Sequence, residues 1–299
     1  MKTLTKNVID VWGSKGRDWL DRLPEILIDL TYYWHLSELR PVDNMSYNYV
    51  AKAIRNGRKP VVIKISCDHE LIENEYRALK HFDGKGSVRV LDINVELNAL
   101  LLEQAISGCL LKTHLSKNID KTIEIYGDIV EALRSSETPP IESSHVEIWC
   151  QAIDRVNDKR IDARYIEKAK ALRDYLLSSS EDEYLCHGDL HLENILCHKN
   201  TWLSIDPKGI IAEAAFEVAA FDLIDKSEWI NLDLILEKIV NRVNLLADVT
   251  DVDKDRLLGW IFLRVIISAQ WFIEDNGDPG KMLKLADILY PLLVKPSSI

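Results

Sequence analysis

The chain has 299 residues, of which 47% are hydrophobic and 28% are charged, and this composition is typical of a soluble globular protein. A formal net charge of −11 argues against a nucleic-acid partner and favours cationic small molecules as ligands. The five cysteines are scattered and include no CxxC pair, so the sequence predicts neither a zinc site nor a disulfide framework.

The N-terminal segment is predicted to form two helices. Its first residues, MKTLTKNVIDVWG, contain no basic region followed by an apolar core, so no secretory signal peptide is predicted. Between Asp10 and about Trp34 the apolar residues recur at helical spacing. Asp21 and Pro24 indicate a break, which would divide this stretch into a pair of helices covering the domain that follows.

A run of β-strands is predicted next. The expected strands are residues 35–41, 47–54, 60–66, 88–93 and 99–104. The loop at residues 42–46 contains no glycine, and Asn56-Gly57 is a strong β-hairpin signal between the second and third strands. The spacing therefore predicts a small antiparallel sheet in the first third of the chain.

One predicted strand contains a lysine among β-branched residues. Val61, Ile63 and Ile65 share one strand face, and Val62 and Lys64 share the other. Burying an unpaired ammonium group is costly, so this lysine is unusual in a strand. It is either a functional cation or a solubilising lysine on an edge strand.

The helix predicted at residues 68–82 offers acidic partners for Lys64. It carries Glu70, Glu73 and Glu75, and its apolar residues recur on one face at helical spacing. At least two of the three glutamates are expected to lie on a solvated face. One of them is expected to form an ion pair with the lysine and hold it in place.

The rest of the chain is mostly helical in pattern. Helices are expected at residues 119–133, 146–156, 160–178, 233–244, 253–273 and 281–294. The most apolar run, residues 257–273, contains Arg264, Ser268 and Gln270, which favours a buried core helix over a membrane span. We therefore expect a cytoplasmic α+β protein with no membrane partner, in which a sheet-rich part precedes a larger helical part.

The stretch from residue 187 to 209, HGDLHLENILCHKNTWLSIDPKG, combines two acids and an amide. Residues 195–198 and 202–205 are predicted to form a hairpin about Asn200, which would place Asn194 and Asp206 opposite each other. One amide oxygen and one carboxylate facing a common point would suit Mg²⁺, which takes oxygen ligands. Asp189 precedes this pair and could accept a proton from a hydroxyl group.

This layout resembles the catalytic segment of kinase-like phosphotransferases. The form HGDLHxxN, with glycine where protein kinases carry arginine, is similar to the aminoglycoside and choline kinase branch. The sequence segments LLLEQA, TWLSIDPKG and FEVAAFD resemble those of a narrower group, the streptomycin and hydroxyurea phosphotransferases. The resemblance extends from about Trp12 to Asp278. It implies a two-lobed protein-kinase-like fold, with a nucleotide-binding lobe at residues 1–104 and a catalytic, substrate-binding lobe at residues 105–299.

The resemblance also implies roles for individual residues. Lys64, anchored by Glu75, would contact the phosphates of ATP that are not transferred, and Asp189 would accept or orient the substrate hydroxyl. Asn194 and Asp206 would hold Mg²⁺. Further contacts to the nucleotide are expected from the backbone at Glu103 and Ala105, the position of the kinase hinge. The glycine-free loop would contribute Ser46 or nearby backbone N–H groups, or it is an ordinary hairpin turn. Lys208 would approach phosphate or pair with Glu213 or Glu217.

Four acidic residues are candidates for binding a cationic substrate. They are Glu213, Glu217, Glu274 and Asp275. The last two end a predicted helix, where the helix dipole disfavours acids, so they either serve a ligand or lie in a simple polar loop. Since streptomycin carries two guanidinium groups, acidic side chains would suit it.

The predicted function is ATP- and Mg²⁺-dependent transfer of the γ-phosphate to a hydroxyl of a small molecule such as streptomycin, or to hydroxyurea. Alternatives are a metabolic kinase of a sugar or amino alcohol, and a nucleotide-binding protein that has lost catalysis. A toxin-like protein kinase is a further alternative, although no peptide-docking segment follows Gly209. The acceptor, the oligomeric state and the choice between ATP and GTP stay open.

Overall fold

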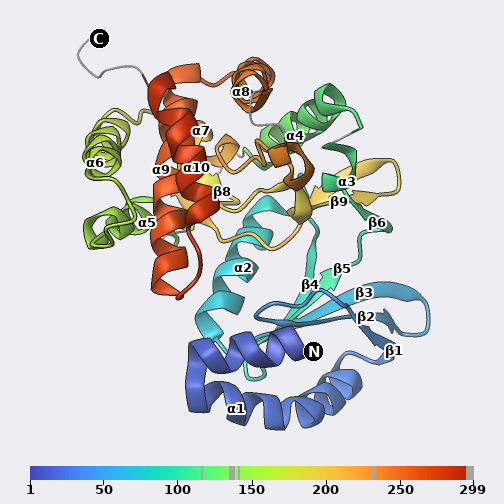
Figure 1. Cartoon of the computed structure of the whole chain (residues 1–299). Helices are drawn as coiled ribbons and strands as arrows, with labels where there is room; N and C mark the ends of the chain where they lie inside the picture. The colour runs from blue at the N-terminus through green and yellow to red at the C-terminus, as the bar shows by residue number, and fades with distance from the viewer. Residues whose placement is uncertain (116, 135–138, 141, 231–233, 294–299) are drawn as a thin grey trace. The chain divides into compact units, whose positions relative to one another are not determined.

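The computed structural model describes residues 1–115, 117–134, 139–140, 142–230 and 234–293. The chain groups into two compact units. The first unit contains Met1–Gly108 and Cys197–Ile205, and the second contains Cys109–Leu196 and Asp206–Ile299 (Figure 1). The first unit therefore continues a few residues beyond the expected boundary at residue 104. It also includes a later segment that the sequence assigned to the second part.

The first unit contains a five-stranded antiparallel sheet with strand order β1-β2-β3-β5-β4. Its elements are α1 (Lys2–Tyr33), β1 (Leu36–Pro41), β2 (Tyr49–Arg55), β3 (Lys59–Ile65), α2 (His69–Phe82), β4 (Val90–Asn94), β5 (Ala99–Glu103) and β10 (Thr201–Ser204). The predicted hairpin at Asn56-Gly57 is confirmed, and both residues have positive φ. The five predicted strands are confirmed, and each strand end lies within two residues of its predicted position.

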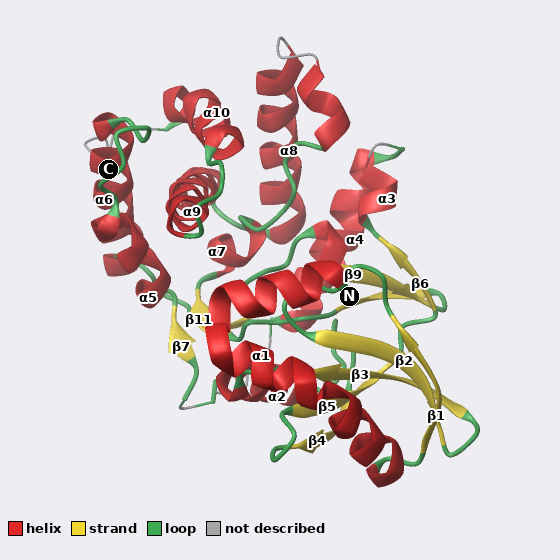
Figure 2. Ribbon diagram, turned by 60° about the horizontal axis from the view of Figure 1, so that its bottom comes forward, coloured by secondary structure: helices red, strands yellow, loops and turns green. Residues whose placement is uncertain are grey.

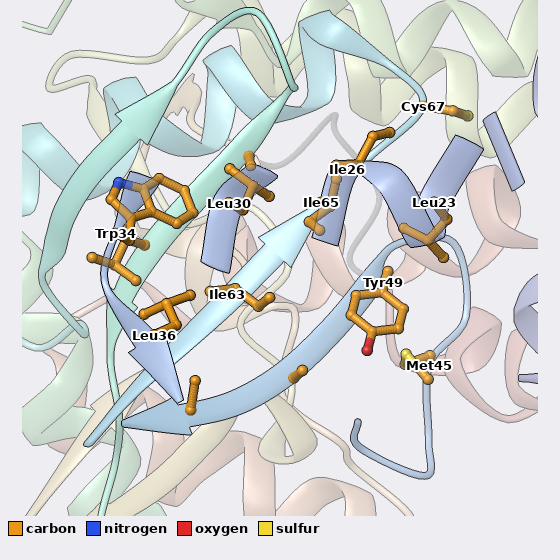
Figure 3. Packing of buried hydrophobic residues seen from close by; sticks show 14 of the residues in the cluster. Leu23, Ile26, Leu30, Trp34, Leu36, Met45, Tyr49, Ile63, Ile65 and Cys67 are labelled. Atoms are coloured by element: carbon orange, nitrogen blue, oxygen red, sulfur yellow. The ribbon is translucent and has the colours of Figure 1, made fainter. Parts of the chain in front are cut away.

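The two faces of this sheet are covered by different helices (Figure 2). The larger apolar cluster joins α1 to the β3 face formed by Val61, Ile63 and Ile65, and Figure 3 shows part of its packing. The smaller cluster joins α2 residues such as Ile72 and Leu79 to the opposite face. The predicted alternation of β3 is thus confirmed, and Lys64 lies on the α2 side.

Helix α1 is broken at a different residue from the one predicted. Gly13 has φ 57° and ψ −121°, a conformation that is open to glycine and strained for other residues, and it separates two helical arms. Pro24 lies inside the second arm, where it removes one hydrogen bond without ending the helix. The prediction of a helix pair is confirmed, whereas the predicted break near Asp21 and Pro24 is wrong.

The second unit is mainly helical. Its longer helices are α4 (Ile119–Leu133), α6 (Ala163–Ser178), α8 (Ile235–Thr250), α9 (Lys254–Glu274) and α10 (Gly280–Leu289). Its short helices are α3 (Lys112–Leu115), α5 (Glu147–Cys150), α7 (Ala214–Val218), η1 (Gln151–Arg155), η2 (Leu192–Asn194), η3 (Lys226–Ile230) and η5 (Tyr290–Leu292). The helix expected at residues 146–156 is split into α5 and η1. Residues 233 and 294, the expected limits of two other helices, lie outside the described residues.

Helix α9 forms the centre of the second unit. It is long and apolar enough to cross a membrane, but 67% of its most apolar window is buried inside the protein. It packs against α6, α7 and α10, and against α8 on another side. These contacts support the prediction of a core helix.

Three short strands of the second unit bring distant parts of the chain together. Strand β11 (Ile210–Ala212) is parallel to β7 (Ser144–His145) and antiparallel to β8 (Tyr184–Cys186). Ile210 is paired with Cys186. The residues that follow β8 and the residues that precede β11 therefore leave the sheet at the same end.

Candidate active site

Lys64 and Glu75 form a buried ion pair in the first unit. The Nζ of Lys64 contacts Oε2 of Glu75, and the two side chains are only 7% and 5% exposed. Strand β3 directs the lysine toward α2, and Asp68 caps that helix by accepting a hydrogen bond from the Glu70 N–H at 3.0 Å. The predicted pairing of Lys64 with Glu75 is confirmed. Glu73 instead pairs with Arg77, on a partly exposed face.

The other predicted nucleotide contacts also lie in the first unit. Ser46 is exposed in the loop between β1 and β2. The backbone N–H of Glu103 already donates to the Arg89 carbonyl at 2.8 Å, so it is not available to an adenine base. Ala105 lies just beyond β5, outside the strands, and is 6% exposed. A hinge-type contact would therefore use the groups that follow the Glu103 amide.

Asp189 follows β8 in a loop that is held through its backbone. Its N–H donates to Nδ1 of His187 at 3.2 Å, and its carbonyl accepts from the His191 N–H at 2.9 Å. The carboxylate is 36% exposed, with Oδ2 3.9 Å from Nε2 of His191. A fixed backbone with an accessible carboxylate suits a group that orients or accepts a hydroxyl proton. His187 is buried, and its ring accepts the hydrogen bond from the Asp189 N–H, so it braces the loop.

Asn194 is oriented by the same loop. Its Nδ2 donates to the Asp189 carbonyl at 2.9 Å. Because a carbonyl oxygen can pair only with the nitrogen end of the amide, Oδ1 is the end that remains for a cation. Asn194 is 8% exposed, so its position is well defined by packing.

The predicted hairpin geometry for Asn194 and Asp206 is wrong. Strands β9 (Ile195–His198) and β10 are joined by a two-residue turn in which Lys199, and not Asn200, has positive φ. Asn194 belongs to η2 and Asp206 lies beyond β10, so neither is a member of a strand pair. Asp206 has φ 64°, which an aspartate tolerates better than most residues.

The β8–β11 ladder, and not the hairpin, joins the two halves of the motif. Lys208 donates its backbone N–H to the His187 carbonyl at 2.7 Å. Gly188 has φ 83°, and a Cβ there would come within 3.1 Å of Ile210. Lys208 Nζ lies 3.5 Å from Oδ1 of Asp206, and both side chains are 38% exposed. Of the partners predicted for Lys208, neither Glu213 nor Glu217 is the one observed.

A buried acid and a partly buried arginine hold the peptide that precedes Asp189. The Gly188 N–H donates to the two carboxylate oxygens of Glu217 at 3.3 and 3.4 Å, and the Gly188 carbonyl accepts from Nη1 of Arg264 at 3.0 Å. Glu217 is 1% exposed, and burial raises the pKa of its carboxyl group to about 7 against the opposing effect of Arg264. Both residues act on the backbone of the catalytic loop through α7 and α9.

The acids predicted to bind substrate have structural partners. Glu213 accepts two 2.8 Å hydrogen bonds from Arg256, and Glu217 is buried as described. Glu274 pairs with Arg155 at 2.8 Å. Asp275 is exposed at the end of α9. The prediction for Glu213 and Glu217 is corrected, because both carboxylates accept hydrogen bonds from donors inside the protein. Residue type alone does not reveal whether an acid binds an internal donor or a ligand.

Arg264 and Asp222 are site residues to which the sequence gave no role. Asp222 accepts from the Leu192 N–H at 2.9 Å and pairs with Lys112 at 2.8 Å, so it fixes the turn between Asp189 and Asn194. The signal for Arg264 was present, because a lone arginine in an apolar helix needs a buried partner. No such signal marked Asp222, which lies among several acids.

An oxygen-donor set for magnesium is consistent with this arrangement. In the described part of the chain, no group of three or more His, Cys, Asp or Glu side chains could hold a metal ion by itself. The Asn194 amide oxygen and the Asp206 carboxylate are hard donors of the type that Mg²⁺ accepts together with phosphate oxygens and water. The chemistry of these two donors therefore fits a metal that arrives with a nucleotide.

Comparisons with known proteins agree with this geometry. The profile of the aminoglycoside/hydroxyurea antibiotic resistance kinases matches residues 33–276. The chain is 26% identical over 282 residues to streptomycin 6-kinase of Streptomyces griseus, covering 88% of this chain and 87% of that protein. It is 29% identical over 230 residues to streptomycin 3''-kinase of Klebsiella pneumoniae, covering 75% and 84%. It is 24% identical over 294 residues to hydroxyurea phosphotransferase of Kitasatospora aureofaciens, covering 93% and 82%.

Solved structures share the fold at low sequence identity. Choline kinase LicA from Streptococcus pneumoniae has a TM-score of 0.66 and 15% identity, covering 90% of this chain and 99% of that chain. A thermostable mutant of aminoglycoside phosphotransferase APH(4)-Ia, in a ternary complex with ADP and hygromycin B, has a TM-score of 0.64 and 12% identity, covering 88% and 97%. The predicted α+β, protein-kinase-like fold is confirmed.

The family match extends over most of the chain and includes the complete segment from His187 to Gly209. The chain is therefore a phosphotransferase of the kinase type. It belongs to the aminoglycoside/hydroxyurea antibiotic resistance kinase family.

Proposed function

We propose that this protein transfers the γ-phosphate of ATP to a hydroxyl group of a streptomycin-like aminoglycoside in the cytoplasm. The observation that carries the proposal is the arrangement around Asp189, whose backbone is fixed while its carboxylate stays accessible. Phosphoryl transfer depends mainly on positioning and on neutralising charge. A held carboxylate that orients the acceptor hydroxyl is one part of that requirement.

Nucleotide binding is assigned to the first unit. The ammonium group of Lys64, held by Glu75, would contact the phosphates that are not transferred. The backbone groups that follow the Glu103 amide, up to Ala105, would form hydrogen bonds with the adenine edge. Ser46 and the backbone of its loop would lie against the phosphates.

Magnesium is assigned to Asn194 and Asp206. When bound, it would neutralise the charge that develops on the phosphate oxygens. The amide of Asn194 is oriented for this role by its hydrogen bond to the Asp189 carbonyl. Lys208 lies beside the Asp206 carboxylate, so the lysine would provide a positive charge near the phosphates as well.

A cationic acceptor is favoured by charge. The net charge of −11 raises the local concentration of cations near the protein. Two of the three relatives named above are streptomycin kinases, and they come from different organisms. Of the acids predicted to bind the acceptor, Asp275 is exposed, and Glu274 forms an ion pair with Arg155.

A metabolic kinase of an amino alcohol is the second candidate. The fold likeness to choline kinase LicA favours it, because the same phosphotransfer residues can serve another acceptor. The two candidates differ in the pocket for the acceptor and not in the catalytic loop. Only a direct comparison of acceptors separates them.

The test is an acceptor panel with purified protein, MgATP and an assay for ADP release. The panel contains streptomycin, hydroxyurea, hygromycin B, choline, ethanolamine and glucose, and products are identified by mass spectrometry. The proposal expects a phosphorylated streptomycin product at a rate well above the rate without acceptor. Preferential phosphorylation of choline or ethanolamine would replace the proposal by the metabolic alternative. ATP binding without phosphorylation of any acceptor would contradict both.

A further inference from the structure

The loop between β1 and β2 is anchored to the core by its central residue. Met45 is 4% exposed, and its Sδ accepts a hydrogen bond from the Val50 N–H at 3.2 Å. The Val42 N–H closes the loop by donating to the Val50 carbonyl at 3.0 Å. Figure 3 shows Met45 beside Tyr49 in the apolar cluster. The glycine-free loop therefore has a fixed point, where a glycine-rich loop would be mobile.

The first arm of α1, residues 2–12, packs closely in the same unit. Leu4 and Val8 are fully buried in the cluster that contains Met45. A Cβ built on Gly16 would lie 2.5 Å from the Val8 carbonyl oxygen, so the two arms of α1 approach closely at this glycine. The break at Gly13 makes that approach possible. The first arm is thus a structural part of the first unit.

Trp12, the last residue of this arm before the break, contacts two elements that the nucleotide site depends on. Its ring meets Tyr47 of the β1–β2 loop edge-to-face, with centroids 6.3 Å apart and an interplanar angle of 83°. Its Nε1 donates to Oδ2 of Asp68 at 3.1 Å. Asp68 caps α2, the helix that carries Glu75. One side chain therefore connects the loop to the helix that holds Lys64.

We propose that Trp12 is a positioning residue for nucleotide binding, which it supports by holding the β1–β2 loop against the start of α2. This inference rests on the proposed function, because it takes that loop to be the one that covers the nucleotide phosphates. In protein kinases, glycines give the loop over the phosphates a flexible backbone. In this protein, side-chain contacts fix the position of the loop instead. Losing the anchor would cost nucleotide affinity, because part of the binding energy would then order the loop.

The test is the variant Trp12→Leu, with nucleotide affinity measured by calorimetry and turnover measured with the best acceptor of the panel. An edge-to-face aromatic pair is worth roughly a 2- to 12-fold change in an equilibrium constant. We expect the Kd and KM for ATP to rise by that factor, with kcat and the KM for the acceptor within about twofold of the wild type. Val11→Ala, at an exposed neighbouring position, is the matched control and should change neither.

Two further variants identify the contact that matters. Trp12→Phe keeps an aromatic ring for Tyr47 and removes the donor to Asp68, so its nucleotide affinity should lie between that of Trp12→Leu and that of the wild type. Tyr47→Leu, at a half-exposed position, should reproduce the effect of Trp12→Leu, and the double variant should add little. Tyr47→Leu also carries the test if Trp12→Leu fails to fold.

The outcomes separate this inference from the proposed function. Wild-type affinity for ATP in folded Trp12→Leu and Tyr47→Leu would overturn the role of Trp12 alone. A loss of kcat equal to the loss of affinity would also overturn it, because the defect would then extend beyond nucleotide binding. If the wild-type protein binds no nucleotide, the proposed function fails and the inference fails with it.

Discussion

The residues proposed to bind the nucleotide, in the first unit, and those proposed to transfer the phosphate, in the second unit, are held in different ways. Lys64 and Glu75 are buried, and they face each other because one strand and the following helix pack together. Asp189 and Asp206 are more than one-third exposed, and their loops are brought together by strands that are distant in the chain. A buried pair suits the fixed charge that we propose for the nucleotide, whereas accessible carboxylates suit the proposed contacts with a metal and an acceptor.

The largest effect is expected from the transfer part. Replacing Asp189 by Asn removes the carboxylate that we propose orients the acceptor, and losing such a group costs on the order of 10²- to 10⁴-fold in kcat. The Kd for ATP should stay within about twofold of the wild type. Glu193→Gln removes an exposed acid of the same loop and should leave turnover unchanged. Wild-type turnover in Asp189→Asn, measured by ADP release, would remove Asp189 from the mechanism.

The buried pair predicts a large effect on stability. Glu75→Gln leaves the Lys64 ammonium without its acid in a buried position, and breaking such a pair costs about 3–5 kcal/mol. Chemical denaturation should show this loss, while Glu73→Gln on the outer face of α2 should show little.

The double variant Lys64→Met/Glu75→Gln sharpens this prediction. Replacing both charges by neutral groups of similar size is often close to neutral for stability. The double variant should therefore recover stability without recovering nucleotide affinity. A double variant as unstable as Glu75→Gln would show that the site needs the ion pair for folding itself.

Glu217 predicts a dependence of stability on pH. Burial raises the pKa of its carboxyl group to about 7, so the folded protein binds this proton more tightly than the unfolded chain does. Its contribution is therefore fully present below about pH 4.5 and is lost as the pH rises through 7, by roughly 3 kcal/mol at most. Denaturation at pH 5 and pH 8 should show a smaller difference for Glu217→Gln than for the wild type. Equal differences would contradict the assigned burial effect.

The smallest of these effects is expected at the metal position. Asp206→Asn should weaken MgATP binding by roughly 10- to 100-fold, because the amide keeps an oxygen donor for the metal and loses the negative charge; losing an outer-shell partner of a metal ligand costs a similar factor. Calorimetry with and without Mg²⁺ provides the control, because metal-free ATP should bind the variant and the wild type equally. An equal loss in both conditions would indicate a structural defect.

Local parts of the site could be predicted from the sequence. The Lys64–Glu75 pair depends on strand alternation and helical spacing within about ten residues, and both patterns are visible in the chain. Asp189 and Asn194 were recognisable from their spacing for a similar reason. The choice of Glu75 over Glu73 needed the family resemblance as well.

Features that depend on the pairing of strands far apart in the sequence could not be predicted in this way. Strand β11 has three residues, too few for a periodic signal, yet its register with β8 brings Lys208 to His187. The predicted hairpin of residues 195–198 and 202–205 is present as β9 and β10, but Asn194 and Asp206 lie outside its strands. Glu217 illustrates the same limit, because an acid in the sequence does not reveal whether it meets a ligand or the Gly188 amide.

One crossed measurement tests the account most directly. Asp189→Asn and Lys64→Met/Glu75→Gln are each assayed for ATP binding by calorimetry and for single-turnover phosphate transfer at saturating ATP. The account predicts that Asp189→Asn binds ATP like the wild type and fails to transfer phosphate. It predicts that the double variant is folded and loses ATP affinity. If both variants lose binding and transfer to the same extent, the assignment of separate tasks to the two parts of the site is contradicted.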